Sequence, residues 1–175
     1  MRLATIVPAS LILCTGCTSA DPTMVLREFA LYSCDQAYST IWDAVDAEHD
    51  IWQPADLSLS GSGETGDGLA YEYQLDADES DTLEDEITYS WTIEVELDGL
   101  ELDSAVVDGS GSWTVEHVRY DLQYAHHAWV GELSVDGQDA EPADFESYFS
   151  GNLHWVTGSL GETEVDWEHA NPDLP

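Results

Sequence analysis

An acidic segment in the middle of the chain offers the clearest candidate for metal chemistry. Asp76, Asp78 and Ser80 alternate in the way that the first three oxygen ligands of a calcium-binding loop do. The sixth position of such a loop is glycine and the twelfth is glutamate, whereas this chain has Asp81 and Ile87 there. We therefore expect a solvated acidic turn between two strands, with calcium binding at the first three residues as the alternative.

Histidine and serine residues give no catalytic pattern. His126 and His127 are adjacent, and neighbours on a strand point to opposite faces, so the two rings cannot easily share a metal ion. His117 and His154 could approach them only across a sheet. The sequence has no HExxH motif and no GxSxG elbow. We predict no catalytic residue and no cofactor, and we expect a protein that is not an enzyme.

Aromatic residues suggest a different kind of site. The chain has seven Trp and eight Tyr, and aromatic side chains on a sheet face beside carboxylates can form a platform for sugars. Tyr89 and Trp91 alternate in phase with apolar neighbours, which favours a place in the core. Tyr71, Tyr73 and Tyr148 are the candidates for an exposed platform.

The charge balance excludes two classes of partner. Three Arg and no Lys oppose 37 Asp and Glu, so the formal net charge is −34. A basic surface for nucleic-acid phosphates or for anionic lipid cannot be built from Arg2, Arg27 and Arg119. Solvent cations, or a cationic partner, are what such a surface attracts.

The N-terminus has the pattern of an export signal. Arg2 is followed by an apolar run over residues 4–13, which is too short to span a bilayer as a helix but suits the apolar region of a signal peptide. Leu13-Cys14-Thr15-Gly16-Cys17 then resembles the lipobox of bacterial lipoproteins, although the family usually has Leu where this chain has Cys14.

This resemblance implies that residues 1–16 are removed and that Cys17 carries a diacylglyceryl group. Two acyl chains anchor a protein stably where one does not. Thr18, which follows the modified cysteine, is not the Asp that retains some lipoproteins in the inner membrane, so the resemblance implies an outer-membrane location. The alternative is ordinary cleavage after Thr18-Ser19-Ala20, which would give a secreted protein.

Whether Cys34 can form a disulfide depends on how the N-terminus is processed. If Cys17 is acylated, Cys34 is alone, and a lone cysteine among apolar residues is most often a buried small hydrophobe. If Cys17 is retained without lipid, a Cys17–Cys34 bridge is possible.

Length and periodicity predict a single domain over residues 24–175 after a short tether over 17–23. Apolar residues at 3–4 spacing predict one or two helices across about 22–49, with the domain's helical part at 24–49. Asp21-Pro22 is a typical helix start. Asp35 could restart the helix after a break near Ser33.

From residue 57 to 169 the period is two, which predicts antiparallel strands. The fold class is therefore mainly β, an antiparallel meander forming a sandwich, a barrel or a curved sheet, preceded by a short helical region. The clearest strand covers residues 87–97, and further strands are expected at 118–124, 129–135, 145–149, 153–155 and 165–167. Residues 58–68 read as a glycine-rich loop or hairpin tip.

Three Asp-Gly pairs, at residues 98–99, 108–109 and 136–137, predict tight hairpin turns. A two-residue turn at Asp98-Gly99 places Glu96 opposite Glu101. Like charges in such pairs destabilise a sheet, and added salt screens them. We therefore expect stability to rise with ionic strength.

These observations predict a lipid-anchored, highly acidic cell-envelope lipoprotein with a non-enzymatic structural or interaction role. The membrane is its partner through the N-terminal lipid, and no protein or glycan partner is identified. The alternative function is a surface module that binds carbohydrate or cations, followed by a hydrolase whose residues the sequence does not identify.

Overall fold

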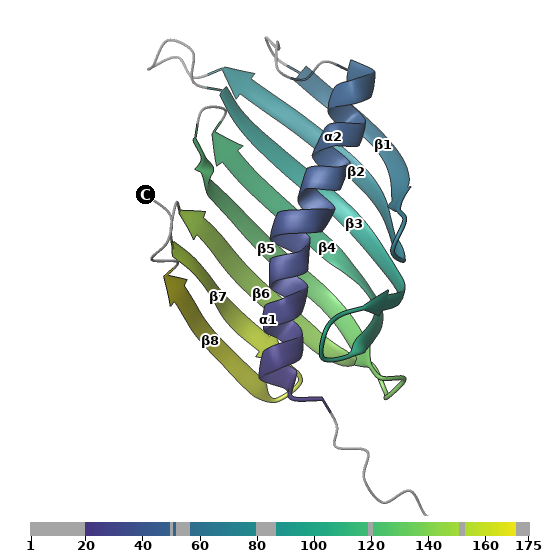
Figure 1. Ribbon diagram of the computed structural model, residues 1–175. Coiled ribbons are helices and arrows are strands. Elements are labelled where there is room, and N and C mark those ends of the chain that lie inside the picture. Colours follow the sequence, from purple (N-terminus) through teal and green to yellow (C-terminus); the bar gives the residue numbers. More distant parts are fainter. Residues whose placement is uncertain are drawn as a thin grey trace, which may run out of the picture.

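One helix and one eight-stranded antiparallel sheet make up the part of the chain that the structure describes (Figure 1). The computed structural model describes residues 20–49, 51, 57–79, 87–118, 121–150 and 153–170. Each strand pairs with the next one along the chain, so the sheet order is β1 to β8. The predicted mainly β meander after an N-terminal helix is confirmed. The elements are α1 (Pro22–Tyr32), η1 (Ser33–Ala37), α2 (Tyr38–His49), β1 (Leu57–Thr65), β2 (Leu69–Glu79), β3 (Ile87–Glu101), β4 (Val106–Val118), β5 (Asp121–Val135), β6 (Glu141–Ser150), β7 (Leu153–Leu160) and β8 (Thr163–Ala170).

The helix begins where the sequence indicated. Asp21 is the N-cap, its Oδ1 accepts a hydrogen bond from the Thr23 amide at 3.0 Å, and Pro22 opens the first turn, inside the interval expected for the tether. The break expected near Ser33 is not found, because α1 continues into α2 through a π-helical turn. The Ser33 hydroxyl donates to the Phe29 carbonyl at 2.8 Å, which satisfies it inside the helix.

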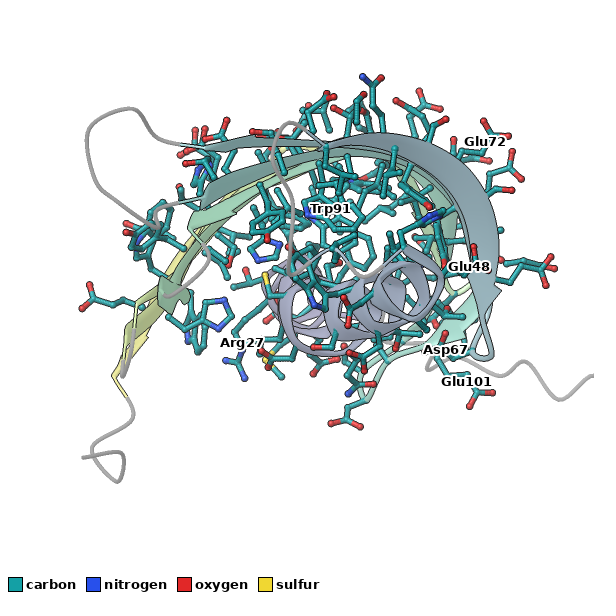
Figure 2. The ribbon with its side chains drawn as sticks, turned by 90° about the horizontal axis from the view of Figure 1, so that it is seen from above. Arg27, Glu48, Asp67, Glu72, Trp91 and Glu101 are labelled. Carbon is teal, nitrogen blue, oxygen red and sulfur yellow. The ribbon has the colours of Figure 1, made fainter. Side chains whose placement is uncertain are left out.

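The core lies between the helix and the concave face of the sheet. Figure 2 shows the sheet curled around the helix, with Trp91 between the two and Glu72 pointing away on the outer face. Phe29 meets the ring of Trp129 edge-on at 5.1 Å, and Tyr38 meets the ring of Trp91 edge-on at 5.9 Å. Of the architectures considered, the curved sheet is the one observed, and its own helix fills the concave side.

Strand β3 confirms the expected alternation. Glu94 and Glu96 lie on the exposed outer face, as do the neutral polar residues Ser90 and Thr92. The residues between them are at most 6% exposed: Tyr89, Trp91, Ile93, Val95 and Leu97.

The hairpin predicted at Asp98-Gly99 is wrong. Strand β3 runs through this pair to Glu101, with a bulge at which Gly99 has φ +67°. The turn lies further on, where the Leu102 amide donates to the Ala105 carbonyl at 2.8 Å. Glu28 from α1 holds that turn, because its Oε2 accepts from the Ser104 amide at 2.9 Å and from the Ser104 hydroxyl at 2.6 Å.

The later turn changes which charges face one another. Glu96 lies opposite Ser110 of β4, so the expected pair with Glu101 does not form. On the other side of β3, Glu94 lies directly opposite Glu72 of β2. A like-charge pair is therefore present on the outer face, but with a different partner.

Of the remaining turn, loop and strand predictions, some are confirmed and others are wrong. Asp136-Gly137 is confirmed as the turn between β5 and β6, with positive φ at both residues. Asp108-Gly109 is not a turn, because it lies within β4. Most of the expected loop at 58–68 belongs to β1, and only residues 66–68 form the turn to β2. The single strand expected at 118–124 is divided, since β4 ends at Val118 and β5 begins at Asp121.

Candidate functional site

A buried polar cluster joins the π-helical turn to β6 and β7. The Ser147 Oγ lies 2.7 Å from the His154 Nε2, and the Cys34 thiol donates to the same Oγ at 3.5 Å. Ser147 is 0% exposed and His154 is 6% exposed. Partial burial raises the pKa of Asp35, next to Cys34 on the helix, and the charge of the nearby His154 opposes this shift only in part.

Serine, histidine, aspartate and cysteine are the residue types of covalent hydrolases, so the cluster has to be judged by access and ionisation. A nucleophilic serine must reach a substrate, and Ser147 has no exposed surface. Burial raises the pKa of the Cys34 thiol to about 12, which keeps it protonated at neutral pH. The cluster as arranged satisfies buried polar groups and ties the helix to the sheet. The expectation that Cys34 is a buried small side chain is confirmed.

The histidines whose side chains the structure describes do not gather at one point. His127 is 1% exposed inside the sheet, where its ring stacks on Trp113 with centroids 5.7 Å apart. His126 lies on the outer face, and its Nε2 is 3.9 Å from the Glu146 Oε2. The adjacent pair thus points to opposite faces, as expected. The side chain of His117 lies outside the described part of the chain.

The structure describes only some of the residues of the calcium candidate. Asp76 lies on β2, where its Oδ2 accepts a hydrogen bond from the Gln74 side chain at 3.1 Å. The side chain of Asp78, together with the whole of Ser80, lies outside the described residues. Among the side chains that are described, no three His, Cys, Asp or Glu residues come close enough to hold a metal ion.

A shallow groove of about 830 Å³ crosses the outer face of β1–β4. No Lys, Arg or His belongs to its lining, so its potential is negative and it concentrates solvent cations. Its floor is open because small residues separate the carboxylates. The acidic residues of the lining are Glu64, Glu72, Glu94 and Glu96.

Two of the three tyrosines expected on the exposed surface are buried. Tyr71 and Tyr73 are 7% and 8% exposed, because β2 turns them toward the concave face that the helix covers. Burial also raises the pKa of both hydroxyls. Tyr148 does lie on the outer face and retains partial exposure. It forms a pair with Trp155, whose ring is inclined by 21° to that of Tyr148 with centroids 6.0 Å apart.

The sequence analysis placed Trp155 on the strand expected at 153–155 but did not name it among the exposed aromatic residues, although a signal for its place beside Tyr148 exists. Gly151-Asn152 is a dipeptide typical of two-residue hairpins. Pairing the residues on either side of it sets Tyr148 opposite Trp155, which is the register observed between β6 and β7.

Comparison of the chain with protein-family models, with curated proteins and with solved structures finds no match. Within the described residues, no helix is both long enough and apolar enough to cross a membrane.

Proposed function

We propose that this chain is a lipid-anchored, highly acidic cell-envelope lipoprotein whose domain has a non-enzymatic structural or interaction role. The observation that carries the second half of this proposal is the position of the helix. It fills the concave face of the sheet, which is the face where a curled sheet would otherwise hold a ligand. The acidic outer face of the sheet and the solvent side of the helix remain open for contacts.

The state of the buried cluster also supports a non-enzymatic role. Ser147 has no exposed surface, and Cys34 stays protonated at neutral pH. Neither side chain is placed or ionised as a nucleophile must be.

The net charge supports a covalent anchor. A chain that begins at Cys17 has 37 acidic residues and two arginines, so it is repelled by anionic headgroups and has no electrostatic affinity of its own for such a membrane. An acylated Cys17 supplies that affinity through two chains. Four residues separate Cys17 from the first residue of the helix, Pro22. Four residues reach at most about 14 Å, which allows the domain to lie beyond a Debye length of about 8 Å from the headgroups.

The test is the intact mass of the protein extracted from membranes of a Gram-negative host. We expect a chain that begins at Cys17 and carries a diacylglyceryl group. Cys17→Ala abolishes the modification and the membrane fraction. Cys14→Ala is the matched control, because it removes the neighbouring cysteine and leaves Cys17, so its product keeps the lipid.

An intact mass without the diacylglyceryl group would contradict the proposed lipid anchor. An unmodified chain that begins at Asp21, recovered from the soluble fraction, would establish the secreted alternative. A membrane fraction that survives Cys17→Ala would show that another feature holds the protein to the membrane.

A further inference from the structure

The two edge strands of the sheet differ in charge. Among the described strands, β1 pairs only with β2, and β8 pairs only with β7. An edge strand presents unpaired backbone N–H and C=O groups, and natural proteins usually protect such an edge with charged side chains. Three exposed acids protect β8 in this way: Glu164, Asp166 and Glu168. The nine residues of β1 include one charged side chain, Glu64, so this edge lacks that protection.

The charges decide which edge an equally acidic second copy can approach. Two antiparallel β8 strands with aligned outer faces would place their carboxylates one strand spacing apart, about 4.8 Å, which destabilises a sheet. If two β1 strands pair instead, the outer-face acids of the next strand, Glu72 and Asp76 of β2, lie three spacings from the β2 strand of the second copy. That separation of about 14 Å exceeds a Debye length of about 8 Å at physiological salt.

A pairing of β1 with its own copy has one register that uses the whole strand. The strand has nine residues, so Gly61 is its centre and lies opposite Gly61 of the second copy. In this register Glu64 faces Ser58, so no acid lies opposite an acid. Leu59, which is half-buried in the single chain, faces Gly63. The strand is therefore complementary to itself.

Two tyrosines of β2 reach over β1 on its concave side. Tyr73 lies opposite Gly61, and Tyr71 lies opposite Gly63. A methyl group added at Gly61 would lie 2.8 Å from Oη of Tyr73, and one added at Gly63 would lie 2.5 Å from Oη of Tyr71. The phenol ends of both rings therefore lie over the two glycines. Neither hydroxyl has a hydrogen-bond partner among the residues that the structure describes.

The pairing brings these phenol groups to the centre of the joint. Because Gly61 faces its own copy, the hydroxyls of Tyr73 from the two chains approach each other, and a phenol can both donate and accept a hydrogen bond. The Tyr71 ring meets Leu59 of the second copy and covers it. Glu48 is an acid whose charge acts on both tyrosines, and its side chain is 77% exposed, so it stays hydrated.

We propose that β1 pairs antiparallel with β1 of a second copy about Gly61, which joins the two eight-stranded sheets edge to edge. The proposal goes beyond the anchored role and does not depend on it, because β1 is the same whether the chain is acylated or secreted. An interface of one strand pair is small beside the roughly 1,200–2,000 Å² of stable complexes, so we expect a reversible dimer that added salt favours.

The test is disulfide crosslinking of two variants of the mature full-length protein, Ser60→Cys and Ser62→Cys. The register places positions 60 and 62 of different copies directly opposite, about 5 Å apart at Cα, whereas identical positions lie on a diagonal of about 7–8 Å. We expect an equimolar mixture, oxidised with diamide, to give at least about fivefold more dimer by intact mass than either variant alone. Glu164→Cys mixed with Glu168→Cys is the matched pair on β8 and should give only the wild-type background. Sharing of a detergent micelle does not select a register, so it cannot produce this pattern.

Substitutions that keep the fold measure the contacts by sedimentation velocity. Tyr73→Phe should weaken the dimer about threefold to fivefold, because it removes the paired hydroxyls and keeps the ring over Gly61. Tyr71→Phe is the matched control, since its hydroxyl lies away from the centre of the joint, and its effect should be less than about twofold. Ser62→Asp should weaken the dimer about threefold, whereas Thr163→Asp adds the same charge to β8 and should have no effect.

Several outcomes overturn the proposal. A mixture that crosslinks no more than the single variants would contradict the register. Equal effects of Tyr73→Phe and Tyr71→Phe, or of Ser62→Asp and Thr163→Asp, would mean that copies associate through another surface. A chain that stays monomeric at 1 M NaCl would contradict the dimer itself. Thiols of Ser60→Cys that are protected from alkylation in cells but not in the purified protein would assign the edge to a different chain.

Discussion

Oγ of Ser147 on β6 lies 2.7 Å from Nε2 of His154 on β7, and both side chains are buried beneath the π-helical turn. The same oxygen accepts the thiol hydrogen of Cys34. One hydroxyl group thus connects the helix to two strands. Because water cannot replace any partner at this depth, the contact has a measurable effect on stability.

Ser147→Ala should destabilise the protein by about 1–3 kcal/mol, since it removes a buried hydrogen-bond partner and leaves polar groups desolvated. The measurement is urea unfolding followed by circular dichroism. Ser159→Ala is the matched control: its hydroxyl donates to the Asp144 carboxylate in an exposed position, so its loss should change the free energy of unfolding by less than about 0.5 kcal/mol. Equal effects of the two substitutions would contradict the structural role assigned to Ser147.

Phe29→Ala should cost about 3–5 kcal/mol, because a fully buried aromatic side chain is replaced by a cavity. Phe29 is 1% exposed and meets Trp129 at 5.1 Å and Phe145 at 5.8 Å, both edge-on, so it fixes the helix to the centre of the sheet. Met24→Ala on the same helix, where the side chain is 38% exposed, should cost far less. Thermal unfolding of both variants tests this, and a mild effect at Phe29 would mean that the helix does not form part of the core.

Cys34 should resist alkylation by iodoacetamide at pH 8 in the folded protein and react readily in urea. Burial raises the pKa of its thiol from 9.0 to about 12, so the folded state keeps a proton that the unfolded chain releases from pH 9 upward. This contribution to stability is complete below pH 9 and is lost as the pH rises toward 12.

The pH dependence gives a second measurement of the same group. Between pH 9 and pH 10 the free energy of unfolding should fall more steeply in the wild type than in Cys34→Ala. Tyr38 contributes in the same direction at higher pH, because burial raises the pKa of its hydroxyl as well. Rapid alkylation of the native protein, or parallel pH curves for the two proteins, would show that the thiol is accessible.

Glu72→Gln should stabilise the protein by up to about 1 kcal/mol in low salt, because it removes a like charge directly opposite Glu94. The gain should disappear in 1 M NaCl, where the Debye length is about 3 Å and the wild type itself is more stable. Glu132→Gln is the matched control, since its cross-strand neighbours are Ser110 and Pro142 rather than acids.

Melting temperatures at both salt concentrations measure this effect. A wild-type midpoint that does not rise with salt would contradict the electrostatic account, as would equal gains from Glu72→Gln and Glu132→Gln.

Local patterns in the sequence were sufficient for the alternation of β3 and for the helix start. The alternation of β3 determines which side chains share a face, and Asp21-Pro22 determines where the helix begins, because both depend on residues close together in the chain. The composition alone determined that the surface is acidic, since 37 carboxylates cannot be buried in one domain.

Contacts between distant residues decided the rest. Asp98-Gly99 has the sequence of a hairpin turn, but Glu28, which precedes Ser104 by 76 residues, holds the chain in a later turn and leaves the pair as a bulge. Tyr71 and Tyr73 share one face of β2 with Leu69 and Leu75, and they are buried because the helix packs against that face. A period of two identifies the two faces of a sheet, whereas the packing of another element determines which of them meets water.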